Sequence, residues 1–396
     1  MKKILQLSTY PIKNPLHGGQ IRVSQIRKFF EQNNYIVKSL SLSEMSHLDY
    51  SEDDMILNAD ELNSLVTVDF CTDYATSLIS VKDKYFEFLK KNILDFNPDI
   101  ILLEQPWLYP AIKKMLDEKY LKSDIKIIYS SQNIEYKTKK SLLESHFQTG
   151  KNVDEVINAI KKLEYDLCQI SSAVICCTQI DADEFINMGA KTTIVCNNGV
   201  SKRTVNQNDL QQIDESLNGR KYILFIGSAY PPNALGFWEM MGESLAYLPP
   251  DCNILVAGGV SNNIEHYMPE NAKLYSFVNM DKIKKLGFLS EEFLAALIQK
   301  ASIILLPITV GGGSNLKTAE AIASQRPVVA TTVACRGFDF VKQLSNFKIA
   351  DNKNDFIKSI KIFLESNTLN EISQTQEDLR NSVYWENTLK RLKEIL

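Results

Sequence analysis

The stretch IILLPITVGGGSNLKTAE, residues 303–320, decides the fold of this chain. It opens with an unbroken apolar run at 303–306, which is typical of a strand buried on both faces of a parallel sheet. A triple glycine follows at 311–313, and Ser314 is a candidate N-cap for a helix expected over 315–324. Strand, glycine-rich turn and helix together predict an α/β unit in which the backbone can approach an anion.

Two charged residues on the expected helix indicate the kind of anion. Lys317 stands in the first turn, where its ammonium can add a point charge to a diphosphate. Glu320 follows three residues later on the same face, and a carboxylate there can accept hydrogen bonds from two sugar hydroxyls. Because neither GxxxxGK[ST] nor GxGxxG is present, the spacing by itself also fits a glycine-rich turn with an exposed Lys–Glu pair.

The same alternation of apolar runs and amphipathic helices continues on both sides of this stretch. Strands are expected at 4–8, 35–42, 99–104, 125–130, 173–178 and 192–196, and then at 222–226, 253–257, 285–288, 303–306 and 328–331. Helices are expected around 27–30 and at 82–96, 153–170, 181–188, 233–245, 290–300 and 315–324. The pattern predicts the α/β class, with two doubly wound Rossmann-like domains facing a central cleft.

The boundaries of these domains follow from composition. The polar stretch 201–219 lacks periodicity and is interpreted as a linker between a first domain at 1–200 and a second at 220–373. The tail 374–396 is expected to form one helix that crosses back to the first domain, because Trp385, so late in the chain, needs a surface that buries it.

Charge and length exclude several classes of protein. The 396 residues carry 44 basic and 48 acidic side chains, a net charge of −4, whereas a nucleic-acid binder usually has a strongly basic domain. Residues 39–81 contain nine acids and no Lys or Arg, and residues 111–140 contain eight lysines against four acids. These stretches are either solvated faces or, for the lysines, a contact with an anionic membrane or acceptor.

The cysteines indicate that the protein works in a reducing compartment, and the histidines give no indication of a zinc site. The seven cysteines are odd in number and form no CxxC pair, and none of the four histidines has zinc-ligand spacing. The apolar part of the N-terminus is too short for a signal sequence, and no run of about 18 apolar residues occurs. We therefore expect a cytoplasmic protein, with peripheral contact at the inner face of the membrane through the lysines.

The run from Pro307 to Thr331 resembles retaining glycosyltransferases of the GT-B fold, glycosyltransferase family four. That family carries a Glu-x7-Glu signature followed by an "EAMA-G-PVVAT" stretch, and Glu320 matches its second glutamate, which binds the ribose of the nucleotide sugar. Gly312 stands where the first glutamate belongs. A subgroup of the family has a glycine-rich signature with an intervening lysine, which Gly313 and Lys317 match.

Other stretches extend the resemblance over most of the chain. Phe225-Ile226-Gly227-Ser228 with Pro232-Asn233 is similar to the opening of the family's donor domain, and Gly287-Phe288-Leu289 to its base-binding strand end. Asn198-Gly199-Val200 resembles the close of the first domain, and Tyr384-Trp385 the start of the crossover helix.

In the first domain the resemblance points to two loops. Gly18 and Gly19 match a glycine pair that faces the donor phosphates and the acceptor, and Gln132-Asn133-Ile134-Glu135 matches an "HNxE" motif in which Gln132 replaces His. Gln132 can keep the hydrogen bond to the donor sugar but carries no proton. Arg22 and His17 flank the glycine pair and either meet an acceptor phosphate or lie in solvent. The loops themselves also fit an ordinary strand-to-helix turn and a polar strand end.

The resemblance implies a retaining transfer of a sugar from a UDP- or GDP-sugar to a glycan, a lipid-linked or a protein-linked acceptor in surface polysaccharide or glycoconjugate synthesis. Lys317, Glu320 and Gln132 would act in catalysis, with no metal and no further cofactor. The nucleotide sugar would contact Gly227, Ser228, Phe288, Gly311, Gly312, Gly313, Ser314, Asn315, Lys317 and Glu320, and the phosphate and acceptor loop would comprise Gly18, Gly19, Arg22, Asn133 and Glu135. The alternative is a noncatalytic subunit of the same fold that binds nucleotide or glycan and supports a partner transferase.

Overall fold

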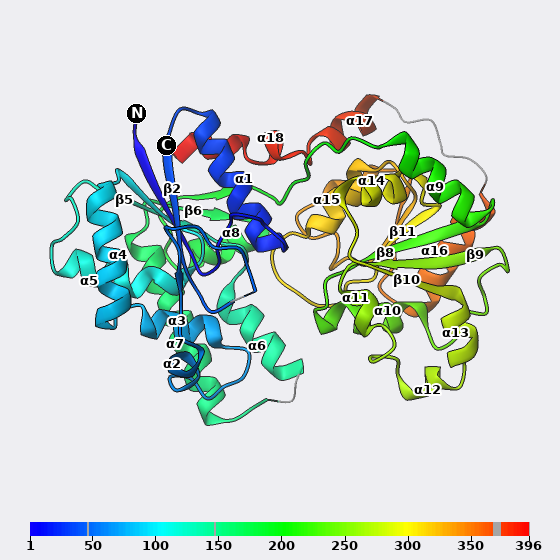
Figure 1. Cartoon of the computed structure of the whole chain (residues 1–396), viewed down its shortest axis with the longest axis horizontal. Coiled ribbons are helices and arrows are strands. Elements are labelled where there is room, and N and C mark those ends of the chain that lie inside the picture. The colour runs from blue at the N-terminus through cyan, green and yellow to red at the C-terminus, as the bar shows by residue number, and fades with distance from the viewer. Residues whose placement is uncertain (46, 146–147, 367–373, 396) are drawn as a thin grey trace. The chain divides into compact units, whose positions relative to one another are not determined.

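The chain forms two compact α/β units. The computed structural model describes residues 1–45, 47–145, 148–366 and 374–395. The first unit comprises Met1–Asn197 with Leu389–Leu396, and the second comprises Asn198–Thr388 (Figure 1). Residue 373, where the sequence analysis ended the second domain, and residue 396, the last of the expected tail helix, lie outside the described residues.

The first unit is built on a seven-stranded parallel sheet in the order β3-β2-β1-β4-β5-β6-β7. Its strands are β1 (Lys3–Ser8), β2 (Ile36–Ser43), β3 (Met55–Ile56), β4 (Ile100–Leu103), β5 (Lys126–Ser130), β6 (Ala173–Cys176) and β7 (Thr193–Val195). Six of them were predicted to within two residues at each end. The short β3, in the acidic stretch, is too brief to produce a recognisable apolar pattern.

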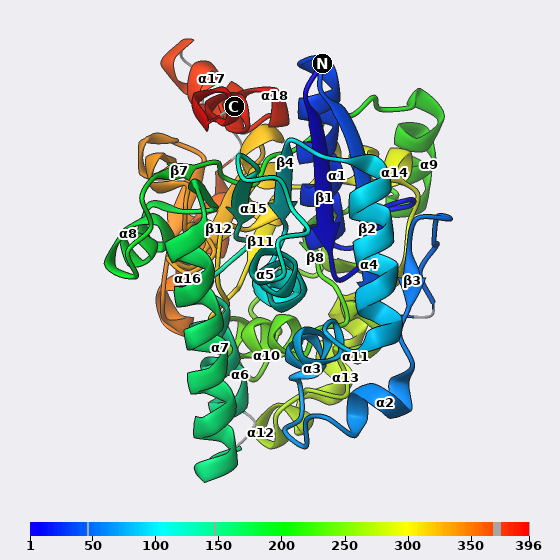
Figure 2. The ribbon, with the colours of Figure 1, turned by 90° about the vertical axis from the view of Figure 1, so that its left-hand side faces the viewer.

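Helices cover both faces of this sheet. They are α1 (Gly18–Gln32), α2 (Ala59–Asn63), α3 (Thr72–Ile79), α4 (Asp83–Phe96), η1 (Pro106–Leu108), α5 (Tyr109–Asp117), α6 (Glu135–Ser145), α7 (Lys151–Ile170), α8 (Gln179–Asn187) and η3 (Lys390–Ile395). Leu5 and Leu7 of β1 belong to the core that α3, α4 and α5 cover, whereas Gln6, between them, points to α1. Figure 2 shows the long helix α7, which packs against α6.

The second unit has a six-stranded parallel sheet in the order β10-β9-β8-β11-β12-β13. Its strands are β8 (Lys221–Ile226), β9 (Cys252–Ala257), β10 (Ile283–Gly287), β11 (Ile303–Leu306), β12 (Val328–Ala330) and β13 (Phe347–Ile349). Its helices are α9 (Gln207–Leu217), α10 (Pro231–Met241), α11 (Val260–Asn263), α12 (Glu270–Lys273), α13 (Ser276–Lys282), α14 (Glu291–Lys300), α15 (Leu316–Ala323), η2 (Asp339–Gln343), α16 (Lys353–Glu365), α17 (Gln374–Asn381) and α18 (Trp385–Thr388). One apolar core joins the sheet to α10, α11 and α16, and another joins it to α9, α14 and α15.

Most of the expected linker 201–219 is helical, which corrects the sequence analysis. Helix α9 occupies Gln207–Leu217 and packs against α14. Ile213 is buried, and Leu210 and Leu217 pack against the same core. An apolar stripe of only three residues in a polar background produced too weak a periodicity to be recognised.

The C-terminal tail is three short helical pieces rather than the one helix that was predicted. Trp385 begins α18 and belongs to the second unit, where its backbone N–H donates to the carbonyl of Val200 at 3.2 Å. Its ring covers Gly199, at which an added Cβ would lie 2.9 Å from the indole. The chain rejoins the first unit only at Leu389, and Leu392 of η3 is fully buried there.

We expect Trp385→Ala to lower the free energy of unfolding by about 3–5 kcal/mol, because it removes a large buried side chain and leaves a cavity. Phe277→Ala is the matched control, since Phe277 is 88% exposed. Urea unfolding followed by circular dichroism measures both. Equal unfolding midpoints for Trp385→Ala and the parent protein would contradict the assignment of Trp385 to the core.

Candidate active site

The strand order of the second unit reverses between β8 and β11, and ligands of doubly wound sheets bind at the carboxyl ends of the strands beside such a reversal. Two segments leave the sheet at this point. Gly227 and Ser228 follow β8, and the glycine-rich segment 307–315 follows β11. The structure therefore brings together two of the segments that the sequence analysis assigned to the nucleotide sugar.

The conformation of the glycine-rich segment depends on its glycines. Gly311 has φ of 138° and Gly313 has φ of 59°, values that residues with a Cβ rarely adopt, and Gly312 is exposed between them. The N-cap of α15 is Asn315 and not Ser314, because the Asn315 side chain accepts the N–H of Lys317 at 2.9 Å.

Ser314 has a different role from the predicted cap. Its hydroxyl oxygen accepts the backbone N–H of Asn198 at 2.8 Å, and its carbonyl accepts the Asn198 side-chain amide at 2.7 Å. The turn at Asn198, noted in the sequence only as the close of the first domain, thus anchors the glycine-rich segment.

A hydrogen-bond network joins α15 to the loop after β8. The Lys317 Nζ donates to Asn233 Oδ1 at 2.8 Å, and Asn233 Nδ2 donates to both the carbonyl and the hydroxyl of Ser228 at 3.1 Å. Asn233 was quoted in the sequence only as part of a motif and was not assigned to the site. It positions the amine that the sequence analysis assigned to the diphosphate.

Burial lowers the pKa of Lys317 to about 8, and the Glu320 carboxylate partly opposes this shift. The amine is therefore mostly charged at pH 7 and loses its charge over the next two pH units. Little water competes for it, so an anion placed beside it would interact strongly.

Glu320 is held by an arginine that the sequence analysis missed. Arg203 Nη2 lies 2.6 Å from Glu320 Oε1 and 2.9 Å from Glu291 Oε2 at the start of α14. The side chains of Arg203 and Glu320 are only 22% and 18% exposed. Arg203 lies in the stretch interpreted as a linker, where no motif distinguishes it from a surface residue.

Of the two further predicted residues, Gly227 adjoins this network and Phe288 has no described contact with it. Gly227 is closely covered, since a Cβ there would lie 2.9 Å from Val260 Cγ1. Phe288 follows β10 at the edge of the sheet and is 82% exposed, and no described contact joins it to Lys317. Its contact with a base stays a prediction.

In the first unit the strand order reverses between β1 and β4, and the loop before α1 lies at this point. A Cβ at Gly19 would lie 2.6 Å from the Tyr10 hydroxyl and 2.8 Å from Gln132 Oε1. Gln132 Nε2 also donates to the Tyr10 hydroxyl. The structure therefore joins Gly19, the second of the paired glycines, to Gln132, and Tyr10 is a member that the sequence analysis missed.

Of the two basic residues beside the glycine pair, Arg22 is buried and His17 is half-buried. Arg22 is 1% exposed, and its Nη1 donates to the carbonyl of Cys196 at 2.9 Å. His17 caps α1, and burial lowers its pKa to about 4, so it is neutral and offers no charge to an acceptor phosphate.

Glu104, at the end of β4, is a buried acid that the sequence analysis did not assign to the site. It accepts a hydrogen bond from Gln6 Nε2 at 2.5 Å. Burial raises its pKa to about 7, with the Gln6 hydrogen bond and the charge of Arg22 opposing the shift. It can therefore hold or release a proton near neutral pH. The paired glycines Gly18 and Gly19 begin α1 and do not lie in the preceding loop, as the sequence analysis expected.

The rest of the predicted phosphate loop is partly or fully buried. Asn133 Oδ1 has no hydrogen-bond partner among the described residues. Glu135 is 5% exposed, and burial, followed by the charges of Asp73 and Glu164, raises its pKa well above the usual range. The backbone N–H of Glu135 donates to Glu164 Oε1 at 2.9 Å, so Glu164 stabilises the start of α6. Glu135 is thus joined to this acidic cluster and not, by any described contact, to Gln132.

Within the described ranges, no three side chains of His, Cys, Asp or Glu come together as a metal site. All seven cysteines lie among the described residues, are buried and form no disulfide, and burial raises the pKa of Cys71 to about 11 and that of Cys196 to about 12. These thiols are therefore poor nucleophiles.

Residues 220–366, almost the whole of the second sheet and its helices, match the family described as "Glycosyl transferases group 1". The second unit is thus similar to the domain of that family. No curated protein sequence matches the chain.

The whole chain shares its fold with solved glycosyltransferase structures. It is similar to sucrose-phosphate synthase from Thermosynechococcus elongatus, with 13% identity and a TM-score of 0.71 over 100% of this chain and 98% of that chain. It is also similar to Anabaena HepE in complex with UDP-glucose, with 15% identity and a TM-score of 0.67 over 100% of this chain and 99% of that chain. For a glycosyltransferase from Rickettsia africae the identity is 16% and the TM-score 0.65, over 100% of this chain and 97% of that chain. The predicted GT-B fold is confirmed.

We predict that UDP binds about tenfold more weakly at pH 9 than at pH 7, because only the protonated Lys317 amine, with its pKa near 8, attracts a diphosphate. Lys317→Met should bind weakly at both pH values, and Lys342→Gln, at an exposed lysine, should keep the dependence of the parent. Calorimetric titration at each pH is the measurement. An unchanged pH dependence in Lys317→Met would assign the titration to another group.

Proposed function

We propose that the protein is a retaining glycosyltransferase whose second unit binds a nucleotide diphosphate sugar at segment 307–320. The group 1 glycosyltransferase domain and the shared fold support the enzyme class. The observation that carries the proposed site is the network from Ser228 through Asn233 to Lys317, at the strand reversal of the matched domain.

The diphosphate would meet three features of the glycine-rich segment. The glycines allow close approach of the backbone, the start of α15 offers N–H groups and the positive end of the helix dipole, and Lys317 adds a charge. Each stabilises negative charge that develops on the leaving phosphate, so the proposed chemistry does not rely on a metal.

Glu320 would bind the ribose. Arg203 contacts its Oε1, and no hydrogen bond from the described residues reaches its Oε2, so a sugar hydroxyl could donate to it. The ion pair would orient the carboxylate before the nucleotide arrives. Of the two donor bases predicted, uracil has the direct precedent, because HepE was solved with UDP-glucose and the E. coli trehalose-6-phosphate protein with UDP-2-fluoro glucose.

In the proposed reaction the bond between the anomeric carbon and the diphosphate oxygen breaks while an acceptor hydroxyl oxygen bonds to the same carbon on the same face. The hydroxyl proton passes to the leaving phosphate oxygen, so no enzyme nucleophile is required. Lys317 and the start of α15 hold the charge of the departing diphosphate.

The first unit would bind the acceptor through Gly19 at the start of α1, together with Gln132 and Tyr10. Gln132 can donate and accept hydrogen bonds but transfers no proton, which suits orientation of a hydroxyl. A glycan, lipid-linked or protein-linked acceptor in surface polysaccharide or glycoconjugate synthesis fits such a polar loop. The seven buried free thiols support a cytoplasmic location.

We expect Glu320→Ala to weaken UDP binding by about 1.5–3 kcal/mol, the range for a hydrogen bond to a charged group. Glu239→Gln, at an exposed glutamate of α10, is the matched control and should leave affinity unchanged. Calorimetry with UDP measures this effect. Unchanged affinity in Glu320→Ala would exclude the ribose contact.

Incubation with a panel of UDP- and GDP-sugars, with and without EDTA, tests the reaction. We expect one sugar to release its nucleotide diphosphate in both conditions and to give a product with the donor's anomeric configuration by NMR. Binding without release across the panel would instead favour the noncatalytic subunit. Loss of release in EDTA would contradict charge neutralisation by Lys317 and α15.

The lysine-rich stretch is largely neutralised by ion pairs. Those described are Lys113–Asp117, Lys122–Asp99, Lys137–Glu184, Lys139–Asp73 and Lys140–Glu144, at 2.6 to 3.9 Å. Asp73 belongs to the acidic stretch, so the two stretches of opposite charge meet. Among the described residues, Lys114, Lys119 and Lys126 make no ion pair. No described helix is long and apolar enough to cross a membrane.

We therefore predict only weak attachment to anionic vesicles, since three lysines contribute about 1 kcal/mol each and salt screens them. Co-sedimentation with anionic and neutral vesicles at low and high salt measures it. Lys114→Gln with Lys126→Gln should abolish the pelleted fraction found at low salt. Strong pelleting at high salt would require a different, apolar contact.

A further inference from the structure

The turn after β12, residues 331–337, lies against the start of α15. Thr318, in the first turn of that helix, is fully buried, and its hydroxyl donates to the carbonyl of Ala334 at 2.6 Å. The hydroxyl of Thr331 donates to the carbonyl of Ile308 and accepts the backbone N–H of Ala334 at 3.1 Å. The turn is therefore fixed both to α15 and to the segment that leaves β11.

Arg336 extends from this turn to the glycine-rich segment. Its Nη2 atom lies 3.5 Å from the position that a Cβ would take at Gly311. Gly311 is exposed and has φ of 138°, so the guanidinium group lies beside backbone that carries no side chain to cover it. A guanidinium group has several N–H donors, so Arg336 can keep other contacts and still donate to an oxygen of a ligand that lies on Gly311.

The glycine-rich segment thus has a cation on each side. The Lys317 amine contacts Asn233, in the helix that follows β8, and Arg336 comes from the turn that follows β12. In the sheet, β11 lies between β8 and β12. A ligand on the segment that follows β11 would therefore meet Lys317 toward β8 and Arg336 toward β12.

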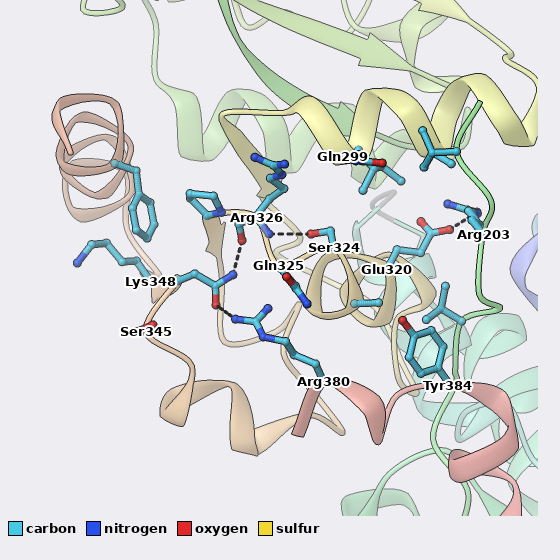
Figure 3. A pocket seen from close by; sticks show the side chains of 18 of the residues that line it. Arg203, Gln299, Glu320, Ser324, Gln325, Arg326, Ser345, Lys348, Arg380 and Tyr384 are labelled. Atoms are coloured by element: carbon cyan, nitrogen blue, oxygen red, sulfur yellow. Dashed lines mark hydrogen bonds and ion pairs between the residues drawn. The ribbon is translucent and has the colours of Figure 1, made fainter. Parts of the chain in front are cut away.

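The order of these groups along the sheet matches the order of the parts of a sugar nucleotide. Glu320, the proposed ribose ligand, faces Arg203 (Figure 3), which also contacts Glu291 at the start of α14, the helix after β10. Strand β10 is the edge of the sheet on the side away from β12. The β-phosphate is the part of the diphosphate farther from the ribose, so it would lie toward β12 and Arg336.

A second cation also balances the charge of the ligand. Each phosphate of a nucleotide diphosphate sugar is negatively charged, whereas Lys317 supplies one positive charge, which it loses as the pH rises past about 8. The guanidinium group of an arginine stays charged throughout this pH range. Where little water lies between the groups, a second fixed cation would strongly stabilise the phosphate that leaves with the nucleotide.

We propose that Arg336 is the second cation of the donor site and that its guanidinium group binds the β-phosphate of the nucleotide diphosphate sugar. This inference rests on the proposed function, because it assigns a further residue to that same site. When the bond from the anomeric carbon to the β-phosphate breaks, its electron pair stays on the phosphate oxygen. Arg336 would stabilise this charge until the acceptor proton arrives.

Calorimetric titration of the full chain with UDP and with UMP tests the proposal, because UMP lacks the β-phosphate. We expect Arg336→Gln to weaken UDP binding by about tenfold, the effect of one charge-assisted hydrogen bond, and to leave UMP binding unchanged. Arg336→Lys, which keeps the charge, should bind UDP more tightly than Arg336→Gln does. Unchanged UMP binding in both variants is a result that a general loss of folding would not produce.

Two further arms separate Arg336 from other cations. Arg220→Gln, at an exposed arginine just before β8, is the matched control and should leave the affinities for UDP and UMP unchanged. The tenfold effect of Arg336→Gln should persist at pH 9, where Lys317 is mostly uncharged.

The outcomes distinguish this proposal from the proposed function. Absence of UDP binding by the parent would contradict the donor site and, with it, the role of Arg336. Weaker UDP binding in Lys317→Met but not in Arg336→Gln would overturn the role of Arg336 alone. Equal weakening of UDP and UMP in Arg336→Gln would also overturn it. So would weaker binding of UDP-glucuronic acid with UDP binding unchanged, because Arg336 would then contact an acidic sugar.

Discussion

The donor site that we propose in the second unit depends on one buried amine, that of Lys317. Lys317 lies where its charge is disfavoured, and it is held by a single described hydrogen bond, to Asn233 at 2.8 Å. Removing water from an ammonium costs free energy, and a diphosphate beside it would recover that cost. The cap at Asn315 and the hydrogen bond from Asn198 to Ser314 fix the end of the glycine-rich segment and the start of α15, where Lys317 lies.

The first unit shows the opposite electrostatic arrangement. Glu104, Glu135 and Glu164 are buried near the carboxyl ends of its strands, and burial raises the pKa of Glu104 and Glu164 to about 7. Carboxyl groups that are neutral at physiological pH repel the oxygen atoms of a polar acceptor substrate less strongly than ionised carboxylates do. Only Glu164 has a clear structural role, since it accepts the N–H groups of Glu135 and Tyr136 at the start of α6.

In the second unit, the sequence predicted those elements whose apolar pattern is contained in a few consecutive residues. Residues 303–306 form a strand as predicted, because an unbroken apolar run suits a strand covered on both faces. Helix α9 and strand β13 were missed, since a three-residue apolar stripe and a three-residue strand carry too little periodicity. Ser314 was mistaken for the cap because the sequence cannot show that its hydroxyl accepts the N–H of Asn198, more than a hundred residues away.

The sequence by itself determined the α/β class and the order of most strands and helices, because apolar period is a property of neighbours along the chain, and its residue chemistry predicted which side chains would hold a sugar nucleotide. Only the tertiary structure decided which of those residues meet. Asn233 reaches Lys317, Arg203 reaches Glu320, and Arg326 meets Arg380 through Asn346. These pairs lie 20 to 117 residues apart, and the strand order that joins them arises from the burial of the whole sheet rather than from any local pattern.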